Sequence, residues 1–260
     1  MLRPRIAPCL LVHDGGLVKT VKFQNPKYVG DPINAVKIFN EKEVDEIIVL
    51  DIDASVGRKE PDYTLIKNLA AECRMPLCYG GGVRTTEQVE RIISLGVEKV
   101  AMSSAAVEDP DLIARAAAVV GSQSIVVVMD VKLSSNRRYE LFVRNGKKAT
   151  GLRPVEFART AECLGAGELV VNSIDRDGTM TGYDLQLAQD VRVATHLPMT
   201  ILGGAGSLKD IAAMIEMFGI IGAAAGSLFV FKGNFRAVLI NYPSRSEKDA
   251  LAPNVLRALA

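Results

Sequence analysis

The sequence lacks tryptophan, and aromatic residues make up only 5% of its 260 residues. Proteins that bind single-stranded nucleic acid stack the bases on aromatic side chains, so this class is disfavoured. The chain also lacks an excess of either charge. It has 31 Lys and Arg residues and 30 Asp and Glu residues, which gives a net charge of +1. A polyanion would find no electrostatic attraction to the chain as a whole. No apolar run reaches the ~18 residues that a membrane-spanning helix requires. We therefore expect neither nucleic acid nor a membrane as a partner.

Cysteine and histidine are also scarce, with four and two copies. The cysteines Cys9, Cys73, Cys78 and Cys163 show neither a CxxC pair nor a spacing to histidine that is typical of zinc ligands. A disulfide framework is not expected in a chain of this size. The sequence therefore predicts four buried or half-buried thiols in a reducing cytosol, a cytoplasmic protein, and no metal or cofactor.

The residues that are present alternate between short apolar runs and amphipathic segments. The runs predict strands at 6–12, 47–51, 77–79, 100–102, 125–130, 169–172, 199–202 and 222–225. The amphipathic segments predict helices near 33–42, 62–73, 86–95, 110–119, 154–163, 184–194 and 207–217, with a last one after Asn234. Eight strands that alternate with helices favour a (β/α)8 TIM barrel, an α/β fold. A doubly wound open sheet is the alternative, but no GxGxxG follows the first strand.

The two halves of the chain resemble each other. Gly81-Gly82 matches Gly203-Gly204, and Ile52-Asp53 matches Ile174-Asp175, both at an offset of 122 residues. Two fused half-barrels would produce this two-fold repeat. We therefore expect one barrel domain over 1–260, with half-repeats at about 1–122 and 123–240.

Two connections after predicted strands are longer than a barrel requires. Residues 13–32 carry three lysines, and residues 131–150 contain a strand-like run followed by Asn145-Gly146, a hairpin-turn signal. Because both follow strands, both lie at the C-terminal face, where the active sites of barrels are built. They are predicted to be lids, with mobile insertions as the alternative.

Glycine- or serine-rich turns follow the third, fourth, seventh and eighth predicted strands. Such turns can present free backbone N–H groups to phosphate. The repeat pairs them into two sites, which suits a substrate with a phosphate at each end. The alternative is tight turns that need positive φ. The predicted phosphate-binding residues are Gly81, Gly82, Ser103 and Ser104 in one half, and Asp177, Gly178, Thr179, Gly204 and Ser227 in the other.

Carboxylates follow several strands, and one of them lacks its counterpart. The half-repeat aligns Asp130 with Leu11, where a symmetric barrel would carry a second aspartate. Acid–base catalysis often uses two groups that face each other across the substrate, and leucine can neither donate nor accept a proton. Asp130 is therefore a candidate catalytic residue without a partner, or alternatively a hydrogen-bonded strand end.

Charged residues precede four strands at the opposite end of the barrel. Arg5, Glu46, Lys99 and Glu168 alternate in sign, and they either cap the core with ion pairs or close a bore through which a small molecule passes. Replacing Lys99 with alanine is expected to leave the fold intact, because an exposed or half-exposed ion pair contributes only about 0–1 kcal/mol.

Over nearly its whole length the chain resembles the cyclase subunit of imidazole glycerol phosphate synthase. The segments that carry the resemblance are 5–10, 30–32, 50–52, 80–84, 104–107, 121–123, 165–168, 173–179, 182–184 and 203–206. In that family a glutaminase makes ammonia, which passes a charged gate and the barrel bore. At the top the ammonia cleaves and cyclises a substrate with two phosphates. The resemblance implies that Lys19 is a lid lysine, Asp51 a supporting carboxylate and Asp130 a catalytic aspartate. It also implies that Arg5, Glu46, Lys99 and Glu168 are the gate.

The chain departs from that family on the cyclising side. Its strand-1 motif has Leu11 where the family has the other catalytic aspartate, and Ser103, Asn172 and Leu202 replace an asparagine, a threonine and a serine. This pattern resembles paralogues that occur with surface-polysaccharide genes. Those paralogues work with a glutaminase and a separate enzyme that amidinates a nucleotide-linked N-acetylamino sugar.

Four hypotheses follow. The chain is an ammonia-channelling synthase subunit for lipopolysaccharide biosynthesis, with a glutaminase at its N-terminal face, a phosphorylated small molecule as ligand and a third, sugar-amidating enzyme. Alternatively it is the cyclase subunit of histidine biosynthesis, a non-catalytic barrel that activates a glutaminase, or an unrelated phosphosugar isomerase on the same fold.

Overall fold

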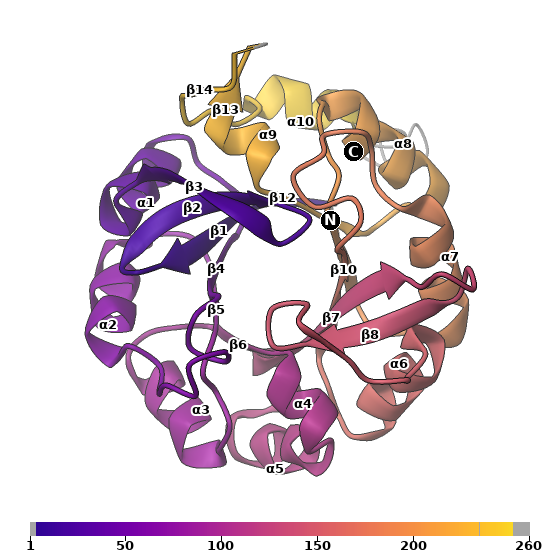
Figure 1. Ribbon diagram of the computed structural model, residues 1–260. Helices are drawn as coiled ribbons and strands as arrows, with labels where there is room; N and C mark the ends of the chain where they lie inside the picture. Colours follow the sequence, from indigo (N-terminus) through magenta and orange to yellow (C-terminus); the bar gives the residue numbers. More distant parts are fainter. Residues whose placement is uncertain (1–3, 234, 252–260) are drawn as a thin grey trace.

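The computed structural model describes residues 4–233 and 235–251. Eight parallel strands in this part of the chain form a closed barrel, in which β7 pairs with both β6 and β10. The barrel strands are β1 (Arg5–His13), β4 (Ile47–Asp51), β5 (Leu77–Gly80), β6 (Lys99–Met102), β7 (Ile125–Leu133), β10 (Glu168–Ser173), β11 (Met199–Leu202) and β12 (Gly222–Ala225). Figure 1 looks along the barrel, with the helices outside. The predicted TIM barrel is confirmed, and the open sheet is excluded.

The helices lie outside the barrel strands, and the longer ones pack one apolar face against them, whereas the last helix has no buried residue. They are α1 (Pro32–Glu41), α2 (Tyr63–Glu72), α3 (Thr86–Ser94), α4 (Ser104–Glu108), α5 (Asp111–Val120), α6 (Pro154–Cys163), α7 (Leu185–Ala194), α8 (Leu208–Phe218), α9 (Ser227–Val230) and α10 (Arg245–Leu251). Side-chain caps fix several starts: Asp31 accepts from the backbone N–H of Asn34, and Asp62 does so from Thr64 and Leu65. The short helices α4 and α9 were not expected from periodicity, because four or five residues show no amphipathic pattern.

Strand alternation divides the core into two apolar clusters. One lies between the strands and the helices, and the other fills the barrel interior. The interior cluster consists of Ala7, Cys9, Ile48, Cys78, Ala101, Val126, Val128, Val170, Leu202 and Ala224, with Leu11 and Leu50 packed against it. Since successive side chains of a strand point to opposite faces, every second residue of each strand enters the interior.

The two long connections form antiparallel hairpins. Residues 13–32 form β2 (Gly16–Val21) and β3 (Gln24–Gly30), which continue β1 in antiparallel pairing. In the second connection β7 pairs with β8 (Tyr139–Val143), and β8 with β9 (Lys148–Ala149). The predicted turn is present, since Asn145 and Gly146 both have positive φ. The Phe23 ring lies against Gly146, where an added Cβ would come within 3.0 Å of it, so the two hairpins meet.

The segment that contains Tyr242 packs beside the start of β1. After β12 the chain forms a small hairpin of β13 (Phe231–Lys232) and β14 (Ala237–Val238), and α10 follows. The Tyr242 hydroxyl donates to the Ile6 carbonyl at 2.8 Å and accepts from the Asp45 backbone N–H at 3.2 Å. This segment therefore anchors the start of β1 to the loop before β4.

The thiols largely follow the prediction. All four cysteines are free, Cys9 and Cys78 are buried and Cys73 is half-buried. Cys163 is exposed, which corrects the expectation of burial, because it ends α6 on the solvent side. Within 4–233 and 235–251, no helix combines the length and apolarity needed to span a bilayer.

Candidate functional site

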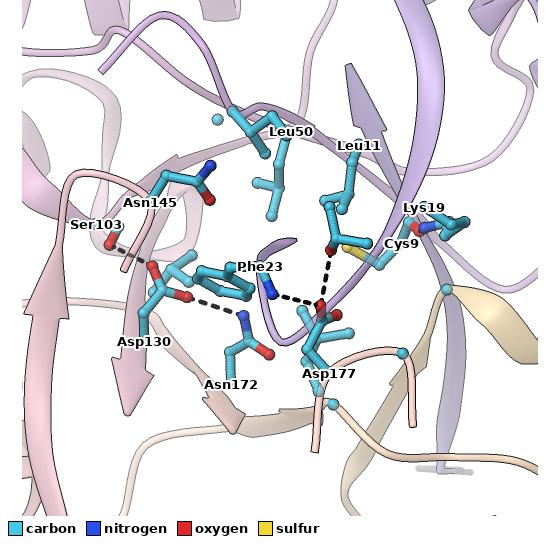
Figure 2. A pocket seen from close by; sticks show the side chains of 18 of the residues that line it. Cys9, Leu11, Lys19, Phe23, Leu50, Ser103, Asp130, Asn145, Asn172 and Asp177 are labelled. Carbon is cyan, nitrogen blue, oxygen red and sulfur yellow. Dashed lines mark hydrogen bonds between the residues drawn. The ribbon is translucent and has the colours of Figure 1, made fainter. Parts of the chain in front are cut away.

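A pocket opens at the C-terminal end of the barrel and is divided into a polar and an apolar side. Ser103 directly follows β6, Asp130 lies on β7 and Asn172 lies on β10, and these strands are neighbours in the sheet. Leu202 and Leu11 extend from β11 and β1, and Leu50 pairs with Leu11 in the register of β1 and β4. Figure 2 shows Leu11 and Leu50 across the pocket from Asp130 and Asn172. The turns of both hairpins reach this mouth, through Phe23 and Asn145.

Asp130 is the centre of the polar side. Its Oδ1 accepts from Asn172 Nδ2 at 2.8 Å, and its Oδ2 accepts from Ser103 Oγ at 3.1 Å. Burial raises the pKa of Asp130 to about 6, although both hydrogen bonds favour the carboxylate. A carboxyl group with a pKa near neutrality suits general acid–base chemistry.

The facing carboxylate is missing, as the sequence indicates. Leu11 lines the pocket at that position. The carboxylates of Asp51 and Asp177 also line the pocket, and both accept hydrogen bonds from neighbouring groups. Asp51 accepts from the backbone N–H groups of Asp53 and Ala54 at 2.9 and 3.0 Å, and burial raises its pKa. Asp51 therefore orders the loop after β4, and its role as a supporting carboxylate stays a prediction.

Lys19 is more deeply held than a residue of a mobile lid. It lies on β2, is buried, and its Nζ donates to the Cys9 carbonyl. Burial lowers the pKa of Lys19. The absence of a side chain at Gly226 leaves room for the ammonium group, since an added Cβ would overlap it. Lys19 still lines the pocket, so its assignment to the site stays a prediction.

In the second predicted phosphate site, the Asp177 carboxylate points to the hairpin of β2 and β3. Asp177 accepts from the Thr20 hydroxyl at 2.7 Å and from the Phe23 backbone N–H at 3.2 Å. Gly178 has a φ of +66°, and a Cβ there would overlap the Thr20 carbonyl. This close approach alone requires glycine at position 178. The Thr179 hydroxyl donates to the Arg176 carbonyl at 2.8 Å.

The structure brings most of the predicted phosphate residues to the pocket. Its lining includes Gly81, Ser103, Ser104, Asp177, Gly178, Gly204 and Ser227, and it does not include Gly82 or Thr179. Both glycine pairs have positive φ, and a Cβ at Gly81 would come within 2.6 Å of the Asp51 carbonyl. The Ser104 hydroxyl accepts from the Arg144 backbone N–H at 2.8 Å. The conformation of the turns therefore explains the presence of these glycines as well as phosphate binding would. Phosphate binding stays a prediction.

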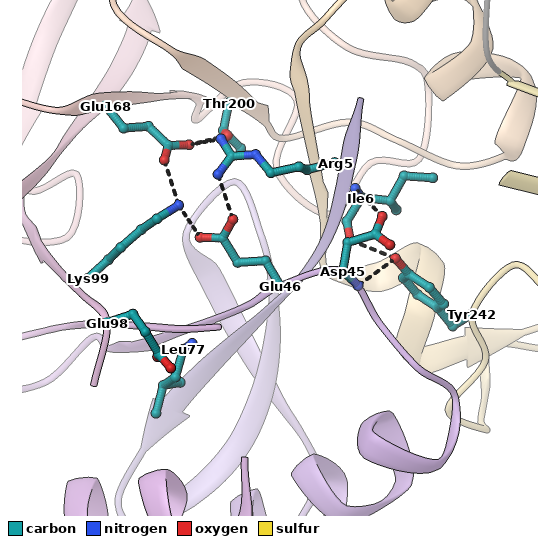
Figure 3. A network of polar contacts seen from close by, with 10 residues as sticks. All are labelled: Arg5, Ile6, Asp45, Glu46, Leu77, Glu98, Lys99, Glu168, Thr200 and Tyr242. Atoms are coloured by element: carbon teal, nitrogen blue, oxygen red, sulfur yellow. Dashed lines mark hydrogen bonds and ion pairs between the residues drawn. The ribbon is translucent and has the colours of Figure 1, made fainter. Parts of the chain in front are cut away.

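At the other end of the barrel, the four charged residues form a closed ring (Figure 3). Arg5 contacts Glu46 at 2.9 Å and Glu168 at 2.7 Å, and Lys99 contacts the same two glutamates at 2.7 and 2.8 Å. The Thr200 hydroxyl donates to Glu168 at 2.6 Å. The glutamate side chains are only 7% exposed and that of Lys99 is 16% exposed. The two glutamates and Lys99 are thus more buried than the sequence led us to expect, whereas the Arg5 side chain is 35% exposed, and a gate at this end of the barrel stays a prediction.

Opposite charges stabilise the ionised forms of the ring. Burial alone would raise the pKa of Glu168, but attraction to Arg5 and Lys99 outweighs it and the pKa is lowered. Burial likewise opposes the charge on Lys99, and the two glutamates nevertheless raise its pKa. Attraction within the ring thus favours the charged forms of Arg5, Lys99 and Glu168 at neutral pH.

The family model described as histidine biosynthesis protein matches residues 5–236. This chain belongs to the histidine biosynthesis protein family. A relative from Leptospira interrogans is 57% identical over 252 residues, which cover 96% of this chain and 99% of the relative. A Vibrio vulnificus relative is 56% identical over 95% of this chain and 96% of its own length. Both carry the provisional name of imidazole glycerol phosphate synthase subunit, HisF and hisF3. A third, from Alkaliphilus metalliredigens, is 42% identical over 88% of this chain and 91% of its own, and is named imidazole glycerol phosphate synthase subunit HisF.

In this member of the histidine biosynthesis family, sequence reasoning missed several residues at the two ends of the barrel. Thr200 contacts the ring through Glu168. Strand alternation in β11 could have predicted this contact, because it directs the Thr200 side chain into the barrel. Asn172 was noted only as a departure from the family pattern, yet it holds Asp130. Tyr242 was not singled out, because a lone tyrosine in a polar segment carries no recognisable pattern.

A second polar group lies at the end of β1. His13 Nδ1 and Asp53 Oδ1 are 2.7 Å apart, and the Asp14 backbone N–H donates to Asp53 at 2.8 Å. The hydrogen bond to Asp53 raises the pKa of His13. His13, Asp14 and Asp53 each offer a ligand atom within 4.8 Å of the others, so they could hold a cation. Such an ion would have to replace the bond between His13 and Asp53, which already orders the chain here.

Proposed function

We propose that this chain is the synthase subunit of a glutamine amidotransferase complex. A glutaminase binds its N-terminal face, and ammonia passes through the ring and the barrel interior to the C-terminal pocket. Family membership supports an enzyme subunit of the type named imidazole glycerol phosphate synthase subunit HisF.

The proposal rests mainly on one observation: the charged ring, the apolar interior and the polar pocket lie one after another along the barrel. The ring of Arg5, Glu46, Lys99 and Glu168 is at one end, the apolar interior is in the middle, and Asp130 is at the other end. Moving an unpaired ion from water into an apolar interior costs a large desolvation free energy, whereas the same transfer costs much less for a small neutral molecule. Such an arrangement suits ammonia.

For the acceptor, we propose amidination of a nucleotide-linked N-acetylamino sugar in lipopolysaccharide biosynthesis, carried out with a separate amidating enzyme. Leu11 supports this assignment, because a leucine lines the pocket where a second catalytic aspartate would face Asp130. Loss of one of two acid–base partners lowers a rate by about 10²–10⁴-fold. The chain alone is therefore expected to cyclise the histidine precursor far too slowly for a pathway.

Cyclisation in histidine biosynthesis is the second candidate. It is favoured by the relatives' names and by Asp130, whose pKa of about 6 suits proton transfer. A barrel that only activates a glutaminase, and an unrelated phosphosugar isomerase, remain as outcomes of the tests below.

Two parallel assays separate the candidates. In the first, the chain is supplied with ammonium at high pH and the histidine precursor, and turnover is compared with that of a family member that carries aspartate at the position of Leu11. In the second, the chain, a glutaminase and the amidating enzyme receive glutamine and the nucleotide-linked sugar. We expect negligible cyclisation and glutamine-dependent amidination. Comparable cyclisation would establish the second candidate, and glutaminase stimulation without any product would indicate an activator.

A further inference from the structure

The inward side chains of single strands connect the ring with the pocket. On β10, Glu168 belongs to the ring, Val170 to the apolar interior and Asn172 to the pocket. The neighbouring β7 continues from Val126 and Val128 to Asp130. A molecule that passes the ring and the apolar interior along these two strands therefore reaches Asn172 and Asp130.

The apolar interior holds no ionised side chain among the residues assigned to it. Its polar members, Cys9 and Cys78, are buried thiols, and burial raises the pKa of both well above neutrality. Asn172 and Asp130 are hydrogen-bond acceptors two residues beyond the interior side chains Val170 and Val128 on the same strands.

The side-chain amide of Asn172 has a hydrogen-bond acceptor that no described residue satisfies. Its Nδ2 donates to Asp130, so the geometry of the amide directs its Oδ1 away from that carboxylate. This Oδ1 is buried and accepts no hydrogen bond from the described part of the chain. It lies beside Gly203, where a Cβ would come within 3.2 Å of it. A buried acceptor without a donor costs about 1–3 kcal/mol, and such an atom calls for a partner.

We propose that Asn172 Oδ1 and the Asp130 carboxylate form an acceptor site for the N–H groups of ammonia where it leaves the barrel interior. Asp130 retains free lone pairs beyond the bonds from Asn172 and Ser103. The leucines on the opposite side offer no hydrogen bond, so they leave ammonia to the polar side. Asn172 is thus a positioning residue for the nitrogen, and Asp130 contacts the same molecule. The inference rests on the proposed function, because that function supplies the ammonia.

The test is an NMR titration of the full chain, without glutaminase or acceptor. Ammonium chloride, sodium chloride and tetramethylammonium chloride are added at equal ionic strength, and the side-chain amide of Asn172 and the carboxyl carbon of Asp130 are observed. We expect a saturable shift of both signals with ammonium chloride alone. As pH rises from 7.5 to 9, less total ammonium should be needed, since the neutral form binds. A response equal to that with sodium, or saturation that is independent of pH, would overturn the proposal.

Two variants provide matched controls. Asn172→Leu keeps the shape of the side chain and removes both the Oδ1 acceptor and the Nδ2 donor to Asp130, so the ammonium response of Asp130 should be lost. Ser103→Ala removes the other bond to Asp130, leaves Asn172 Oδ1 in place and should retain the response. Equal responses in both variants would contradict the assignment. Because no glutaminase is present, an absent response with intact amidination refutes this inference alone, whereas a normal response without ammonia transfer refutes the proposed function.

Discussion

Replacement of Lys99 by methionine tests the energetic description of the ring. The substitution keeps an apolar stem and removes the charge that contacts Glu46 at 2.7 Å and Glu168 at 2.8 Å. Removing one partner of a fully buried ion pair costs about 3–5 kcal/mol. Arg5 still contacts both glutamates, and Lys99 is 16% exposed, so we expect a smaller loss, about 2 kcal/mol of unfolding free energy. This exceeds the 0–1 kcal/mol of an exposed pair, because the ring is buried.

The loss should appear in urea denaturation at pH 7 and as a decrease in Tm of about 4–8 °C. Arg115→Met is the control, because Arg115 and Asp109 form a 2.6 Å pair whose side chains are about half exposed. It should cost no more than about 1 kcal/mol. Combining Lys99→Met with Glu168→Gln should recover part of the loss, because the double variant restores the balance of charge. Equal losses in Lys99→Met and Arg115→Met, or no recovery in the double variant, would refute the reasoning.

Three further outcomes are expected. Burial raises the pKa of Asp130 from 3.8 to about 6, so its ionised form is costly to fold and Asp130→Asn should stabilise the protein by about 2–3 kcal/mol at pH 8. That gain should fade as pH falls from 6 to 4 in thermal denaturation, and a gain independent of pH would contradict the assignment. Leu11→Asp should raise ammonium-dependent cyclisation only in part, since Ser103 and Leu202 also differ from the family pattern. Full activity, or none, would show that Leu11 is not the main obstacle. Crystals grown in sulfate should hold anions at the turns around Gly81 and Gly204, whereas turns without anions would favour the purely conformational interpretation of the glycines.

The barrel could be predicted because the signal is repeated. Each strand is a short apolar run followed by a turn and an amphipathic helix, and eight such units leave few alternatives. The ring could also be anticipated, since residues that directly precede parallel strands meet at one end of the barrel. Its burial could not, because exposure depends on Thr200 and on the neighbouring strands rather than on the four residues themselves.

The details of the pocket depend on contacts between distant segments. The hydrogen bond between Thr20 and Asp177 joins residues that are 157 apart in the sequence, and no local sequence pattern predicts it. Lys19 was assigned to the lid by resemblance, whereas the structure buries it on β2. Asn172 could be recognised as an inward residue of β10, but its unpaired Oδ1 is visible only in three dimensions.

The most direct test of ammonia channelling is isotope dilution in the reconstituted complex of this chain, a glutaminase and the amidating enzyme. Glutamine labelled with ¹⁵N in its amide is supplied together with an excess of unlabelled ammonium chloride, and the ¹⁵N content of the amidinated sugar is measured by mass spectrometry. Transfer through the barrel predicts a product that retains nearly all of the label, and partial dilution when Lys99 is replaced by methionine. A product with the isotopic composition of the bulk ammonium would contradict channelling.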